Sequence, residues 1–76
     1  MEQKLFEIVG KVMGVPHGAV TDLSSPASIK QWDSLRHMRL ILAVEESFGI
    51  QFSEDEIVGI KSVGDVIKYL APKTAN

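Results

Sequence analysis

The sequence predicts an all-α fold, a four-helix bundle with a long first connection and a short third helix. Apolar residues recur at helical spacing along the chain, and two serine-containing capping signatures occur in its C-terminal third. The extended stretch "GIQF" has no second strand with which to pair, so we expect a loop there. At 76 residues the chain has room for one core. We therefore predict one domain over residues 1–71 and a disordered tail over residues 72–76.

The segment "EQKLFEIVGKVMG" is expected to form the first helix. Its apolar residues follow the i, i+3, i+4, i+7, i+8 pattern of an amphipathic helix: Leu5, Ile8, Val9, Val12 and Met13. Gly14 and Pro16 are expected to end it. The connection over residues 15–33 is long for a small domain. Its expected anchors to the bundle are Val20, Leu23, Ile29 and Trp32.

The second predicted helix runs from about Ser34 to Phe48, with Asp33 or Ser34 as its N-cap and Gly49 as its stop. Its apolar residues span about 220 degrees, which is more than a surface helix needs to bury. One arc should face the core and consists of Leu40, Ile41, Val44 and Phe48. A second arc lies beside it and consists of Leu35, Met38 and Leu42.

Two explanations of the second arc remain open. Leu23 or Ile29 of the long connection folds over it, or the arc stays exposed as a docking patch beside Ser34. The arginines of this helix differ in their sequence neighbours. Arg36 has Asp33 three residues before it as a possible partner.

Arg39 has no acidic residue three positions before or after it. It is therefore either simply solvated or free to meet a carboxylate or a phosphate of a partner.

Two capping signatures predict the remaining helices. "SEDE" is a capping box with Ser53 as the cap and Glu56 reaching back, and it should open a short helix to about Ile60. "SVGD" repeats the signature and should start a fourth helix, which Pro72 is expected to end.

Composition and charge exclude several classes of protein. The chain has no cysteine and two scattered histidines, so we expect neither a disulfide framework nor a metal site. Its net charge of −2 argues against nucleic acid as a partner. The N-terminal residues do not have the pattern of a signal peptide, and no stretch is apolar enough to span a membrane. We expect a cytoplasmic monomer.

Ser34 is the residue whose chemistry the sequence leaves open. A nucleophilic serine needs a base and a group that orients the base. His37 lies about one helical turn after Ser34, but no carboxylate stands at a spacing that would orient it. We therefore expect His37 to be structural and the chain not to be an enzyme. Ser34 is then either a plain N-cap or the attachment point of a phosphate-containing group, which a helix N-terminus would stabilise.

The segment "WDSLRHMRLILAVEESFGIQF" closely resembles the core of acyl and peptidyl carrier proteins, and "SVGDVIKYL" extends the resemblance over nearly the whole chain. In that family an Asp-Ser-Leu motif opens the second helix, and its serine receives 4′-phosphopantetheine from coenzyme A. The resemblance implies a bundle of the acyl-carrier type that holds its cargo as a thioester on an arm attached to Ser34. It implies that Asp33 and Leu35 help the transferase to recognise the site. It also places Met38 and Leu42 on the helix face that partners read.

The partners that the resemblance implies are a phosphopantetheinyl transferase, an acyl- or aminoacyl-activating ligase, and downstream transferases or synthases. Carriers of primary fatty acid synthesis resemble one another in having acidic residues at the start of this helix, where this chain has Arg36 and Arg39. Trp32 is more similar to the residue found in peptidyl, D-alanyl or stand-alone specialised carriers. We therefore expect an acyl or aminoacyl carrier of a specialised fatty acid, polyketide or nonribosomal pathway. The alternative is a helical interaction module without a prosthetic group.

Overall fold

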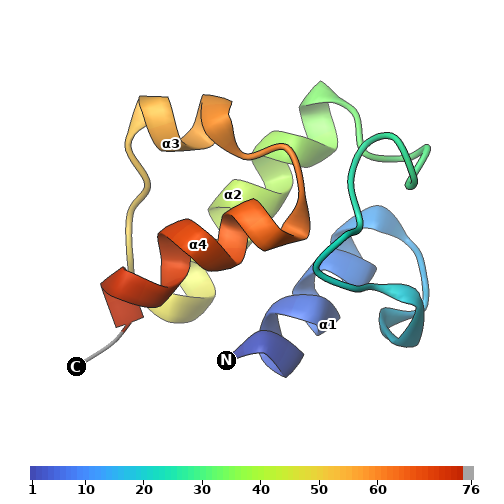
Figure 1. Ribbon diagram of the computed structural model, residues 1–76, viewed down its shortest axis with the longest axis horizontal. Helices are drawn as coiled ribbons and strands as arrows, with labels where there is room; N and C mark the ends of the chain where they lie inside the picture. Colours follow the sequence, from blue (N-terminus) through green and yellow to red (C-terminus); the bar gives the residue numbers. More distant parts are fainter. Residues whose placement is uncertain (75–76) are drawn as a thin grey trace.

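Four α-helices surround one core in the computed structural model, which describes residues 1–74 (Figure 1). The elements are α1 (Glu2–Met13), a 3₁₀ turn η1 (His17–Ala19), α2 (Ser34–Phe48), α3 (Glu54–Gly59) and α4 (Val63–Thr74). Figure 1 shows the long connection on the same side of the molecule as α1, with α3 on the opposite side. No strand occurs within residues 1–74, so the predicted all-α class is confirmed.

The core is built from the apolar stripes of α1, α2 and α4. Nine side chains are almost completely buried: Leu5, Val9, Met13, Leu40, Ile41, Val44, Val63, Val66 and Leu70. The long connection adds Val20, Ile29 and Trp32, which are buried as the sequence predicts. Burial of apolar surface stabilises a fold by roughly 25 cal/mol per Å². The burial of these three side chains therefore holds the connection against the helices.

Leu23 was predicted as a further anchor of the connection, and this prediction is wrong because its side chain is 82% exposed. The connection docks here through its backbone instead. The carbonyl of Asp22 accepts a hydrogen bond from the N–H of Gly64, and the carbonyl of Ser24 accepts one from the N–H of Val63. These bonds satisfy N–H groups in the first turn of α4, which have no partner within the helix. With Asp22 and Ser24 facing α4, the side chain of Leu23 between them lies in solvent.

The ends of α2 are set by local chemistry. Asp33 is the N-cap, because its carboxylate accepts a hydrogen bond of 2.9 Å from the N–H of Arg36. Gly49 ends the helix in the left-handed conformation with φ of 66°, which glycine adopts at little cost. The predicted bounds of this helix are therefore confirmed.

The predicted capping box of α3 is present. The Ser53 hydroxyl accepts a hydrogen bond from the N–H of Glu56, and the Glu56 carboxylate accepts one from the N–H of Ser53. The hydrogen bond from the backbone of Ser53, helped by the ammonium of Lys73 at 3.1 Å, lowers the pKa of Glu56. Both contacts favour the charged carboxylate at the positive end of the helix.

The prediction that Pro72 ends α4 is wrong, because the helix continues through Pro72 to Thr74. Proline removes one N–H from the last turn, and side chains supply other bonds there. The Thr74 hydroxyl lies 3.3 Å from the carbonyls of both Leu70 and Ala71 and can donate to either. Lys73 pairs with Glu56. The tail predicted over residues 72–76 is thus helical over residues 72–74, and residues 75–76 lie outside the described part of the chain.

The two faces of α2 predict different costs for the same substitution. Leu40 is fully buried and Leu42 is 59% exposed. We expect Leu40→Ala to lower the free energy of unfolding by about 2–5 kcal/mol, because it opens a cavity in the core. Leu42→Ala is the matched control and should change it by about 0.5 kcal/mol or less. Urea denaturation measures both, and equal losses would contradict the assignment of core and surface.

Candidate functional site

Ser34 occupies the first position of α2, directly after the N-cap. Its side chain is exposed, and its hydroxyl makes no hydrogen bond to any atom of residues 1–74. The capping role belongs to Asp33, so the alternative in which Ser34 is the N-cap of this helix is wrong. This hydroxyl therefore makes no hydrogen bond that stabilises the fold of residues 1–74.

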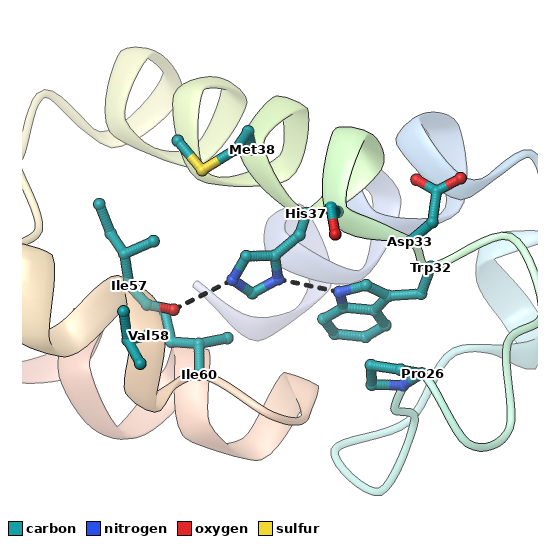
Figure 2. Close-up of a pocket in the computed structure, with 9 residues that line it drawn as sticks. Pro26, Trp32, Asp33, His37, Met38, Ile57, Val58 and Ile60 are labelled. Atoms are coloured by element: carbon teal, nitrogen blue, oxygen red, sulfur yellow. Dashed lines mark hydrogen bonds between the residues drawn. The ribbon is translucent and has the colours of Figure 1, made fainter.

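His37 does not activate Ser34. Its Nδ1 accepts a hydrogen bond of 3.0 Å from the indole Nε1–H of Trp32. Its Nε2 lies 3.0 Å from the carbonyl oxygen of Ile57 (Figure 2). Both ring nitrogens are therefore engaged away from Ser34, in agreement with the structural role that the sequence predicts for His37.

An open, mostly apolar groove of about 530 Å³ begins beside Ser34 and runs between the first turns of α2 and the helix α3. Figure 2 shows Trp32 and Pro26 at one end and the side chains of α3 at the other. The residues that line it are Pro26, Trp32, Asp33, Ser34, His37, Met38, Ile57, Val58 and Ile60. Sequence reasoning missed Pro26 and the three residues from the α3 region, because nothing in their spacing relates them to Ser34.

The second apolar arc of α2 is exposed. Leu35 is 62% exposed, and Met38 and Leu42 are exposed as well. Of the two residues that could have covered the arc, Leu23 lies in solvent and Ile29 belongs to the core. Val58 of α3, which is 76% exposed, extends the apolar surface across the groove.

The two arginines of α2 have different environments. The guanidinium of Arg36 donates a hydrogen bond of 3.2 Å to the carbonyl of Met13, the last residue of α1. The carboxylate of Asp33, suggested by the sequence as its partner, instead accepts from the backbone N–H of Arg36. Arg39 is exposed and makes no hydrogen bond or ion pair with the side chains that the structure describes. Arg39 is therefore the free cation of this face.

Other classes of site find no support in the described chain. Residues 1–74 contain no group of three or more His, Cys, Asp or Glu side chains that could hold a metal ion. Every helix in the same range is too short or too polar to cross a bilayer.

Residues 3–70 match the model of a family described as "Phosphopantetheine attachment site". An acyl carrier protein of Acidothermus cellulolyticus is 35% identical over 72 residues, which cover 95% of this chain and 86% of that protein. The chain belongs to the acyl carrier protein family. An acyl carrier protein of Rickettsia massiliae is 36% identical over 70 residues, or 92% of this chain and 81% of that protein. A solved structure from Mycobacterium tuberculosis, assigned to the acyl carrier proteins, superimposes with a TM-score of 0.84 at 25% identity and covers 93% of this chain and 95% of its own.

Membership of this family defines the chemistry in general terms. The chain is a carrier rather than an enzyme, and its prosthetic group is covalently attached 4′-phosphopantetheine. The thiol that holds the cargo as a thioester belongs to this arm, so a chain without cysteine can still act as a carrier. A carrier of this family depends on a phosphopantetheinyl transferase and on partner enzymes.

Because Asp33 caps α2 and Ser34 does not, replacing each residue by alanine should change the free energy of unfolding to a different extent. Asp33→Ala removes the cap and should lower the free energy of unfolding by about 0.5–2 kcal/mol. Ser34→Ala removes a hydroxyl that bonds to nothing and should change it by about 0.5 kcal/mol or less. The two apo variants can be compared by urea denaturation. A loss for Ser34→Ala as large as that for Asp33→Ala would show that the serine contributes to the cap.

Proposed function

We propose that Ser34 carries the 4′-phosphopantetheine arm. The observation that supports this most directly is its exposed hydroxyl, which no other residue of the described chain engages. The N-terminus of α2 presents unpaired N–H groups and partial positive charge, which would stabilise the phosphodiester. In the attachment step the Ser34 oxygen would form a bond to the phosphorus next to the pantetheine part of coenzyme A. The pyrophosphate P–O bond on the other side of that phosphorus would break, adenosine 3′,5′-bisphosphate would leave, and the proton of the serine hydroxyl would be released.

The groove beside Ser34 fits an acyl cargo. Most of its lining is apolar: Pro26, Trp32, Met38, Ile57, Val58 and Ile60. An alkyl chain laid along these side chains would leave water at a gain of roughly 25 cal/mol per Å². The charged ammonium of an aminoacyl group would lose hydration among the same side chains. We therefore propose acyl rather than aminoacyl groups as the cargo.

The exposed arc of Leu35, Met38 and Leu42 is the proposed docking surface for partner enzymes. Asp33 and Leu35 flank Ser34 directly and would be the first residues that a transferase meets there. Arg39 gives the surface a positive charge that no neighbour neutralises within the described residues. Because like charges weaken docking, the fitting partners have an acidic patch at this point.

This charge supports a specialised pathway rather than primary fatty acid synthesis, whose enzymes present basic patches to their carriers. The proposed partners are an acyl-activating ligase, which loads the arm, and downstream transferases or synthases, which unload it. Arg36 has a smaller part in this docking than the sequence suggests, because its guanidinium is held at the end of α1.

The attachment residue can be tested by intact mass. Wild-type protein incubated with coenzyme A and a broad-specificity phosphopantetheinyl transferase should gain one phosphopantetheinyl group. Ser34→Ala should gain none, because it lacks the oxygen that attacks the phosphate. Ser47→Ala, which removes another exposed serine of α2, should be modified like the wild type. Modification of folded Ser34→Ala would show that another residue carries the arm. A wild type that stays unmodified, while the same enzyme modifies a control carrier, would instead favour the alternative of an interaction module without a prosthetic group.

The charge of the docking surface can be tested with a malonyl transferase of primary fatty acid synthesis as the probe. Arg39→Glu should raise the kcat/KM of this transferase for the phosphopantetheinylated chain by about three- to tenfold at low salt. The gain should shrink at high salt, because screening weakens attraction between exposed charges. Lys11→Glu makes the same charge reversal on α1 and should have little effect. Equal rates for the wild type and Arg39→Glu would contradict the proposed role of this charge.

A further inference from the structure

The imidazole of His37 joins three separate segments of the chain next to the groove. Trp32, at the end of the long connection, donates to its Nδ1 at 3.0 Å. The carbonyl of Ile57, in α3, lies 3.0 Å from its Nε2. Figure 2 shows the ring between these two groups, with both contacts drawn. The imidazole ring of His37 stacks with the indole ring of Trp32, with the ring centroids 6.2 Å apart and an angle of 27° between the ring planes.

One protonation state alone satisfies both contacts. The indole N–H of Trp32 can only donate, so Nδ1 of His37 must be the acceptor. The carbonyl of Ile57 can only accept, so Nε2 must carry the hydrogen. Both contacts are thus satisfied together only by the tautomer that has its hydrogen on Nε2. This form has no spare nitrogen for chemistry at Ser34, so any effect of His37 on the site acts through the position of other groups.

The helix that His37 contacts has few other ties to α2. α3 has six residues, and none of its side chains is fully buried. Its capping box is local, and its ion pair joins it to α4 through Lys73. Gly59 also faces α4, since a Cβ there would lie 2.9 Å from the Tyr69 hydroxyl oxygen. Among the side-chain hydrogen bonds of residues 1–74, that of His37 is the one that joins α2 to α3.

The carbonyl of Ile57 is well placed to receive this bond. It belongs to the last turn of α3, where carbonyl groups lack regular partners within the helix. The N–H of Ile60 reaches it only at 3.4 Å, whereas His37 Nε2 lies at 3.0 Å. The imidazole thus supplies the shorter bond, at the end of the helix that carries partial negative charge.

We propose that His37 is a positioning residue that holds α3 against α2 and so fixes the groove beside Ser34. Ile57 and Val58 line that groove from α3, while His37 itself and Met38 line it from α2. Without the bond, α3 keeps its ties to α4 and separates more readily from α2. The part of this inference that concerns the sheltering of cargo rests on the proposed attachment at Ser34 and the proposed acyl cargo.

Three substitutions separate the contributions of the two hydrogen bonds. His37→Phe keeps a ring of similar size and loses both bonds. His37→Asn places an amide oxygen near the position of Nδ1 and keeps only the acceptor for Trp32. His37→Gln carries an amide nitrogen out to the position of Nε2 and keeps the donor for Ile57. His17→Phe is the matched control, since His17 is exposed and lies in η1.

The first measurement is amide hydrogen exchange of the apo proteins. Exchange of α3 should be faster by about threefold or more in His37→Phe and His37→Asn, and within about twofold of the wild type in His37→Gln. His17→Phe should match the wild type. Nitrogen NMR of the wild-type ring should show the hydrogen on Nε2. Unchanged α3 exchange in all variants, α3 exchange in His37→Gln as fast as in His37→Phe, or a hydrogen on Nδ1 in the wild type overturns the proposal.

The second measurement uses the chain loaded with an octanoyl-phosphopantetheine arm from octanoyl-coenzyme A. Hydrolysis of the thioester should be faster by about threefold in His37→Phe and His37→Asn than in His37→Gln and the wild type. Equal hydrolysis rates in variants with faster α3 exchange would overturn the role of His37 in the groove. A wild type that accepts no arm overturns the proposed function instead, and the exchange of the apo proteins still decides whether His37 positions α3.

Discussion

The capping of α2 by Asp33 is the interaction on which the site depends. A helix begins with N–H groups that have no partner, and one side chain near the start must accept from them. Asp33 does so, through the N–H of Arg36. The adjacent Ser34 is thereby left exposed on the first turn, with a hydroxyl that the fold does not use. The residue that stabilises the helix and the residue proposed to carry the arm are thus neighbours with separate tasks.

The groove depends on both sides of this helix start. Trp32 is buried directly before the cap and lines the groove from the end of the connection. α3 supplies the opposite wall, although it has no fully buried side chain of its own. A wall of this kind is held by contacts outside itself, to α4 through Lys73 and to α2 through His37. Such a segment belongs to the less stable part of a fold, which would suit the proposed role of the groove as a shelter for acyl cargo.

The exposed face of α2, which we propose as the docking surface, combines exposed apolar side chains with a positive charge. Leu35 and Leu42 keep apolar surface in water, and their exposure leaves the core intact because Leu40 and Ile41 fill it from the other face. Arg39 adds a charge that nothing in the described chain compensates. Apolar contact supplies affinity, and charge selects among partners and speeds their encounter.

The sequence by itself determined where the four helices begin, the stop of α2 at Gly49 and the capping box of α3, because these depend on contacts between residues at most five positions apart. It narrowed the cap of α2 to Asp33 or Ser34, and only the hydrogen bond to Arg36 decided for Asp33. It also marked Ser34, through the motif that resembles carrier proteins. Contacts between distant residues decided the rest. Leu23 and Ile29 are similar side chains of one connection, and only the bonding of its backbone to α4 turned Leu23 outward.

The partners of the charged and polar residues of α2 were decided in the same way. Arg36 is paired with the carbonyl of Met13 and His37 with that of Ile57, and both carbonyls lie about twenty residues away in the chain. The helix α4 continues past Pro72 to Thr74, where Lys73 pairs with the distant Glu56. Periodicity and capping are local properties that a sequence displays directly. The groove and the partners of its residues exist only once separate helices pack together, because packing alone brings such distant groups within bonding distance.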